Sequence, residues 1–148
     1  MTKKDTRGSP LPRLAKALKN LRKLEIIVEH LPYRELSPNS REHFMVKARA
    51  VKAQREEVGW LAKVQWHDQS PMRHARISYR FIVQDKRHRD IDNLIASAKS
   101  MVDGLVSAGV LVNDDAEHLI WWKATIQSGN VNQTIILIEE IVLTEEKK

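Results

Sequence analysis

The alternation of apolar and polar positions along the chain predicts several strands. In residues 76–83, Ile77, Tyr79, Phe81 and Val83 fall on one face of an extended segment. Four other segments have the composition of strands: 24–30, 63–67, 118–126 and 133–143. A Ser-Gly-Asn turn at 128–130 predicts that the last two strands form a hairpin.

Two longer segments have apolar residues at helical spacing. In residues 41–62 the expected apolar stripe consists of Phe44, Ala48, Val51, Val58 and Leu61. In residues 94–108 the inward positions are Leu94, Ile95, Ala98, Met101, Val102 and Leu105. We expect Gly109 to end the second helix and one of three residues to cap the first: Ser37, Asn39 or Ser40. The pattern predicts an α/β chain of the α+β type, a small mixed β-sheet with two main helices packed on it.

The length of 148 residues is that of one domain. We assign residues 23–148 to this domain and residues 1–22 to a basic N-terminal extension, in which leucines recur at helical spacing. The sequence contains no cysteine, which excludes disulfides and thiolate metal sites. It has no apolar run long enough to cross a membrane and no signal-peptide segment, so we expect no membrane partner.

Charge is distributed unevenly along the chain. Residues 1–55 hold 14 Lys and Arg against 5 Asp and Glu, a balance of +9, whereas the remaining residues have a balance of −3 within the total of +6. A basic half beside a mildly acidic half is typical of a polyanion-binding surface that faces an acidic centre. A basic surface can also serve solubility alone, so charge by itself leaves nucleic-acid binding open.

The candidate chemistry begins between the strand 76–83 and the helix that follows it. Asp90 and Asp92 are two positions apart, so on an extended segment both carboxylates point the same way. Converging carboxylates form a hard oxygen site that suits Mg²⁺, and Mn²⁺ is a possible substitute. The same pattern is also that of an ordinary capping turn, in which Asp92 or Asn93 begins the helix.

Two further acidic positions and one lysine complete the candidate site. Lys99 and Asp103 share the helix face that continues from Asp92, and Asp114 and Asp115 follow the helix. To bring Asp114 and Asp115 back toward Asp90, the chain needs a short strand that lies beside the strand 76–83. Carboxylate-held divalent ions can activate water and neutralise a scissile phosphate, and a lysine can stabilise the developing charge. The structural alternatives are a turn at 114–115 and a surface ion pair between Lys99 and Asp103.

Basic residues near this segment are candidates for contact with DNA phosphates. The loop before Asp90 contains Lys86, Arg87, His88 and Arg89. The first expected helix contains Arg41, Lys47, Lys52 and Arg55. The sequence has no phosphate-cradling glycine loop and no serine-nucleophile elbow, so we expect neither a nucleotide cofactor nor Ser/His/Asp catalysis.

The segment DIDNLIASAKSMVDGLVSAGVLVNDD at 90–115 resembles the RusA family of Holliday junction resolvases. The segment LSPNSREHFMVKARAVKAQRE at 36–56 is similar to the early loop and first helix of that family, and the resemblance covers about residues 24–143. One difference is the spacing of the lysine, because Lys99 follows Asn93 by six residues where the best-known members have three.

The resemblance implies a homodimeric, Mg²⁺-dependent endonuclease that cuts four-way DNA junctions in recombination and repair, in the cytoplasm of a bacterial or phage-infected cell. It implies that Asp90, Asp92 and one of Asp114 and Asp115 bind the metal and that Lys99 assists catalysis. Two other interpretations remain open: a non-catalytic DNA-binding protein, and a nuclease for flaps, forks or RNA.

Overall fold

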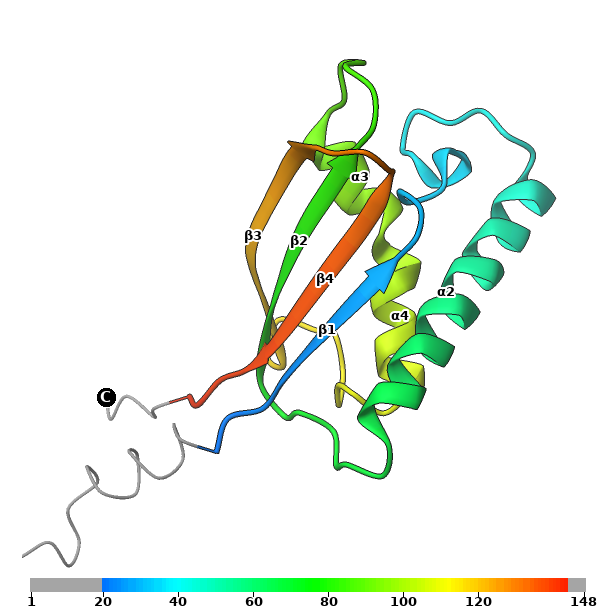
Figure 1. The fold of residues 1–148 in the computed structure, drawn as a ribbon. Helices are drawn as coiled ribbons and strands as arrows, with labels where there is room; N and C mark the ends of the chain where they lie inside the picture. Colours follow the sequence, from blue (N-terminus) through cyan, green and yellow to red (C-terminus); the bar gives the residue numbers. More distant parts are fainter. Residues whose placement is uncertain (1–19, 144–148) are drawn as a thin grey trace, which may run out of the picture.

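The computed structural model describes residues 20–143, so almost all of the expected extension 1–22 lies outside the described residues. The chain begins with β1 (Lys23–Val28), the short 3-10 helix η1 (Arg34–Leu36) and α2 (Phe44–Trp66). It continues with β2 (Ala75–Val83), α3 (Ile91–Ser97) and α4 (Lys99–Ser107), and ends with β3 (Leu119–Ser128) and β4 (Gln133–Glu140). The expected fold class, a small mixed sheet with helices packed on it, is confirmed (Figure 1).

The four strands form one sheet in the order β1-β4-β2-β3. β4 is antiparallel to both β1 and β2, whereas β3 runs parallel to β2 after the crossover through α3 and α4. The expected hairpin between the last two strands is therefore wrong, because β2 lies between them. The connection passes over the end of β2, where the Gly129 N–H donates to the Val83 carbonyl at 2.9 Å. A Cβ at Gly129 would lie 2.3 Å from Ile82 Cγ2, so a larger residue there would require the Ile82 side chain to shift.

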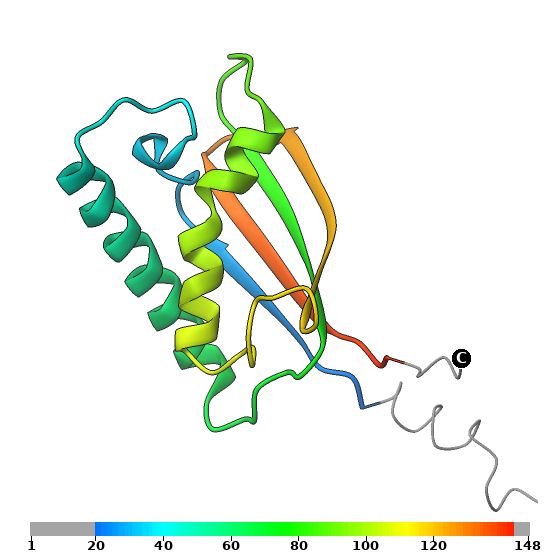
Figure 2. The same cartoon turned by 180° about the vertical axis from the view of Figure 1, so that it is seen from behind.

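The helices cover one face of the sheet and leave the other face open (Figures 1 and 2). Every second residue of β2 is buried, from Ala75 to Val83, as its alternation predicts. Those from Ala75 to Phe81 meet the large apolar residues buried in α4, namely Met101, Val102 and Leu105, in one core cluster. Burial of this apolar surface is the main favourable contribution to folding.

The buried face of α2 differs from the expected one. Its buried residues follow a strict four-residue spacing: Ala50, Gln54, Val58, Ala62 and Trp66. Phe44, in contrast, is 70% exposed. The helix continues through residues 63–66, and Ala62 and Trp66 extend the buried series. The strand expected at 63–67 is therefore wrong. The cap is also different: His43 Nδ1 accepts the Met45 N–H at 3.2 Å.

The second expected helix is divided at Ala98 into α3 and α4. Ser97 Oγ donates to the Asn93 carbonyl at 2.7 Å, and the Ser97 carbonyl accepts from Gln54 Nε2 at 2.8 Å. A carbonyl turned toward another helix interrupts the regular hydrogen-bond ladder, which is a recognised cause of helix bending. Gly109 ends α4 with a φ of +79°, as the sequence predicts.

Gln54 is a buried polar residue at the centre of the helix layer, and it was not among the residues selected from sequence. Its side-chain amide donates to the Ser97 carbonyl and, at 2.7 Å, to Ser100 Oγ. Its carbonyl oxygen accepts the Tyr33 N–H at 3.0 Å. One side chain therefore joins α2, the α3–α4 break and the loop before η1.

Within residues 20–143, no helix combines the length and apolarity that a membrane crossing requires.

The contact between α2 and α4 depends on Gly104. A Cβ at this position would lie 2.5 Å from the Arg55 carbonyl oxygen and 2.9 Å from the Gly59 nitrogen, both backbone atoms. We expect Gly104→Ala to lower the free energy of unfolding by about 1–3 kcal/mol, as overpacking of a core does. The measurement is urea unfolding followed by circular dichroism.

Gly59, which faces Gly104 from α2, is the matched control. A Cβ there would lie 3.4 Å from the nearest atom, an ordinary contact. Gly59→Ala should therefore keep or raise stability, by up to about 1 kcal/mol from helix propensity. Equal stability of the two variants would show that the interhelical contact can relax.

Candidate functional site

The loop between β2 and α3 is organised by Asp85. Its carboxylate accepts two hydrogen bonds from the Arg89 guanidinium, at 2.7 and 3.1 Å, and one from the Arg87 N–H at 3.0 Å. The hydrogen bonds from Arg89, followed by the one from Arg87, lower the pKa of Asp85 to about 2. The Arg89 side chain is only 10% exposed. Arg89 therefore shapes the loop, while Lys86, Arg87 and His88 are exposed.

Asp90 and Asp92 lie at the beginning of α3. Asp90, and not Asp92 or Asn93, is the N-cap: its Oδ1 accepts the Asp92 N–H at 2.9 Å. Asp92 is already in the first helical turn, so the two residues do not share one extended segment. Both carboxylates are exposed at the positive end of the helix, where negative charge is favoured.

Lys99 brings two distant parts of the chain together. Its Nζ donates to Asp103 Oδ1 at 2.8 Å, one turn along α4, and it also pairs with Asp114 from the segment after α4. Burial lowers the pKa of Lys99, but the two carboxylates outweigh this effect and the pKa is raised. Lys99 is therefore a cation held between two carboxylates.

Asp115 points into a different set of contacts. Its Oδ1 accepts from His118 Nδ1 at 2.6 Å and from the backbone N–H groups of Glu117 and His118, while its Oδ2 accepts from Asn113. Among residues 20–143, Asp115, Glu117 and His118 are the one group of three or more Asp, Glu or His side chains whose possible ligand atoms all lie within 4.8 Å of one another. His118 was not among the site residues predicted from sequence, because a turn with positions i, i+2 and i+3 is not a recognised ligand spacing.

The two halves of the expected acidic site remain apart. The segment after α4 does return beside β2, through an isolated bridge between Met72 and Leu111 and then through β3. However, Leu119 pairs with Ala75 at the beginning of β2, whereas Asp90 follows the end of β2. Among residues 20–143, no hydrogen bond or ion pair joins Asp90 or Asp92 to Asp114 or Asp115. The return brings Asp114 to Lys99 instead.

The expected DNA-binding residues of the first helix also differ from one another. Arg41 lies before α2 and faces the loop 87–90 across a cleft. Lys47 Nζ donates to the Ser40 carbonyl at 3.0 Å, and Lys52 Nζ lies 4.0 Å from Glu56 Oε1. Arg55 borders a separate, smaller depression beside the exposed Trp60. Arg41 is thus the member of this group that lies beside the acidic segment.

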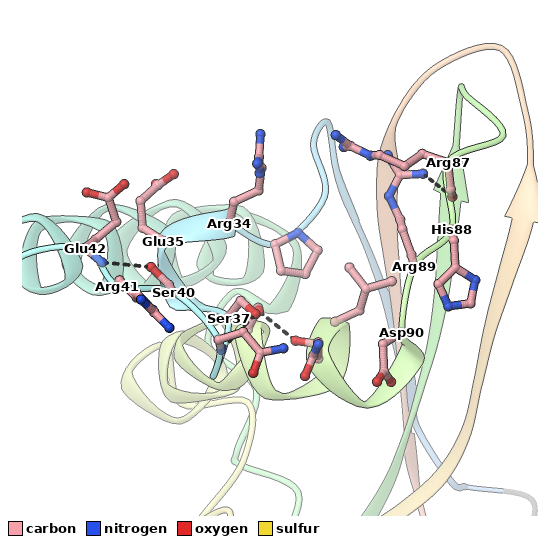
Figure 3. A pocket seen from close by; sticks show the side chains of 15 residues that line it. Arg34, Glu35, Ser37, Ser40, Arg41, Glu42, Arg87, His88, Arg89 and Asp90 are labelled. Atoms are coloured by element: carbon pink, nitrogen blue, oxygen red, sulfur yellow. Dashed lines mark hydrogen bonds between the residues drawn. The ribbon is translucent and has the colours of Figure 1, made fainter.

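The cleft itself is lined by residues 32–42 on one side and 87–97 on the other (Figure 3). Its volume is about 610 Å³, within the range of small-molecule sites. Arg34 and Arg41 belong to the first wall, and Arg87, His88 and Asp90 to the second. Asp90 therefore borders a cavity, while Asp114 and Asp115 lie outside it.

Comparisons with known proteins assign no family. No family model matches the chain, and no curated protein matches it. Similar solved structures include the hydrogenase maturation protein HypE in complex with ATP, at 14% identity and a TM-score of 0.33, covering 83% of this chain and 31% of that chain. AaThiL complexed with AMPPCP and TMP gives 7% identity and a TM-score of 0.35, covering 94% of this chain and 43% of that chain.

Thiamine monophosphate kinase from Aquifex aeolicus gives 12% identity and a TM-score of 0.33, covering 87% of this chain and 40% of that chain. The chain thus spans less than half the length of these proteins. TM-scores this low do not define a shared fold. The resemblance to RusA resolvases accordingly stays a prediction.

The contacts of Asp115 lead to a prediction on its titration. The hydrogen bond from the His118 side chain, with smaller contributions from the backbone N–H groups of residues 117 and 118, lowers the pKa of Asp115. A lowered pKa stabilises the fold above the unfolded value of 3.8, and this stabilisation is lost as pH falls through the folded pKa. His118→Ala should therefore raise the pKa of Asp115 toward 3.8, measured by carboxyl NMR.

Asp85 is the internal control, because its pKa of about 2 depends on Arg89 and should not change. An unchanged Asp115 titration in His118→Ala would mean that the ring contact contributes nothing to holding this turn.

Proposed function

We propose that the protein is a metal-dependent endonuclease for branched DNA, most specifically for four-way junctions, acting by phosphodiester hydrolysis. The observation that carries the proposal is the contact of Lys99 with Asp114, residues 15 apart in sequence. If Lys99 formed only an ordinary surface ion pair within its own helix, the contact with Asp103 would be sufficient. The added contact makes the lysine and the second acidic segment, which the sequence resemblance treats as one motif, neighbours in space.

Oxygen donors of the right kind are present for the metal. Asp90 and Asp92 would hold it, because exposed carboxylates are the hard ligands that Mg²⁺ and Mn²⁺ prefer. Asp114 or Asp115, which the resemblance adds as a ligand, has no contact with this pair among residues 20–143 and would have to approach it when the metal and DNA bind. When bound, such an ion supplies a nucleophilic water and neutralises charge on the phosphate. The position of Asp90 beside the cleft, with Asp92 two residues further on in the first turn of α3, supports this role.

The remaining residues have roles that follow from their charge and place. Lys99 would stabilise negative charge on the reacting phosphate, for which it must exchange one carboxylate partner for a phosphate oxygen. Arg87 and His88, exposed on the loop before Asp90, would bind flanking phosphates. Arg89 would act through Asp85 by holding that loop in place.

The open face of the sheet supports a homodimer. Ile120 is 43% exposed and Trp122 is 52% exposed, and Arg76 lies 4.7 Å from the Trp122 ring centroid. An exposed apolar patch of this kind is typical of an association surface. A symmetric dimer would place two sites on two strands of one junction.

Asp90→Asn tests the catalytic assignment with little risk to the fold, because asparagine is an equally good N-cap. We expect cleavage of a labelled four-way junction in Mg²⁺ to fall at least about 100-fold, more than loss of a supporting contact gives. Binding to the junction should be retained. Asp68→Asn, in the exposed turn after α2, is the matched control and should cleave normally.

Full activity of Asp90→Asn would remove Asp90 from the mechanism. Junction binding without cleavage by the wild-type protein, in Mg²⁺ and in Mn²⁺, would favour the non-catalytic DNA-binding alternative, in which Asp90 is a cap alone. Equal cleavage of flaps, forks or RNA would favour the broader nuclease alternative.

A further inference from the structure

The wall of the cleft formed by residues 32–42 has no role in the proposed hydrolysis. It is a loop that carries η1 and leads into α2, and Gln54 holds its beginning through the Tyr33 N–H. Opposite it lie the loop 87–90 and α3, which Gln54 holds through the Ser97 carbonyl. The same buried side chain therefore fixes both walls, and the spacing between them is a built property of the fold.

Three arginines border this cleft without a carboxylate partner, although Glu35, Glu42 and Asp90 also line it. Within residues 20–143, neither Arg34, Arg41 nor Arg87 forms a salt bridge. Arg34 and Arg87 lie on opposite walls (Figure 3). Like charges facing one another across a cavity repel, and an anion with more than one charged oxygen relieves that repulsion.

The interior of the cleft suits a nucleobase. Asn39 and Asn93 line it, and neither side-chain amide has a hydrogen-bond partner among the described residues. Side-chain amides pair with the edges of bases. Pro32 and Leu94 add apolar surface against which a base can pack. The volume of about 610 Å³ is large enough for a nucleotide-sized group.

We propose that this cleft binds one unpaired nucleotide of the branched DNA, with Arg34 and Arg41 on one wall and Arg87 on the other contacting its flanking phosphates. The inference rests on the proposed function and adds its substrate geometry. A strand at a branch point offers a base that can leave the stack at low cost, and proteins that act on such strands combine basic grooves with base contacts. Asp90, at the cleft border, would then meet the phosphate next to the extruded nucleotide.

The test uses the full chain and four-way junctions that carry 2-aminopurine at single positions near the branch, without divalent metal. Binding of the wild-type protein should raise the fluorescence at one position, because that base becomes unstacked. The double variant Arg34→Ala/Arg41→Ala should lose this rise. It should also reduce the slope of log affinity against log salt by about two, one for each lost phosphate contact. Arg73→Ala, an exposed arginine before β2, should behave as wild type.

The same proteins are then assayed for junction cleavage in Mg²⁺. Two results would overturn the cleft proposal alone if the wild type cleaves junctions. One is the absence of a fluorescence change at every position. The other is a double variant that matches the wild type in salt slope and in fluorescence. A wild-type protein that neither binds nor cuts any junction would overturn both proposals. Circular dichroism verifies that the double variant is folded. Asn39→Ala is a second variant, in which the binding affinity should depend less on which base occupies the unstacked position.

Discussion

The Gln54 side chain is the contact on which the arrangement of the helix layer depends. A buried amide must satisfy its hydrogen-bonding groups inside the protein, since leaving one unpaired costs about 1–3 kcal/mol. Gln54 satisfies both donors and its acceptor, and the partners belong to three different segments. A buried apolar side chain would allow these segments to slide, whereas hydrogen bonds fix their positions. The geometry of the cleft and of the α3–α4 break follows from this requirement.

The break at Ala98 determines which residues Lys99 can reach. In one continuous helix, Asp92, Lys99 and Asp103 would lie in a narrow stripe, as helical spacing predicts. The interruption at Ser97 and Ala98 turns α4 relative to α3 and places Lys99 at the start of a new helix. The lysine then lies between Asp103, one turn along, and Asp114, from the return segment. A residue that the sequence places beside Asp92 is thus directed toward the second acidic segment.

The fold was predicted from sequence where one periodic pattern decided the structure. The alternation in β2 and the apolar positions of α4 gave the correct elements, because burial on one face leaves a simple signal. The face of α2 was wrong because two alanines and a glutamine occupy it, and such residues carry little hydrophobic signal. The hairpin expected between the last two strands was also wrong, since the short connection at 129–132 gives no indication that β2 separates β3 from β4.

The candidate site was predictable in its residues but not in its geometry. Asp90 and Asp92 were selected for their spacing, yet the helix begins two to three residues earlier than expected, and this turns Asp90 into a cap. A cap and a metal ligand make different demands on a carboxylate, but the two are compatible. Asp90 Oδ1 accepts the Asp92 N–H, and the second carboxylate oxygen has no hydrogen-bond partner among residues 20–143. The helix N-terminus favours the negative charge of both residues within its first turn. Capping therefore holds the Asp90 carboxylate in one orientation, which is the preorganisation that an ion-binding oxygen needs.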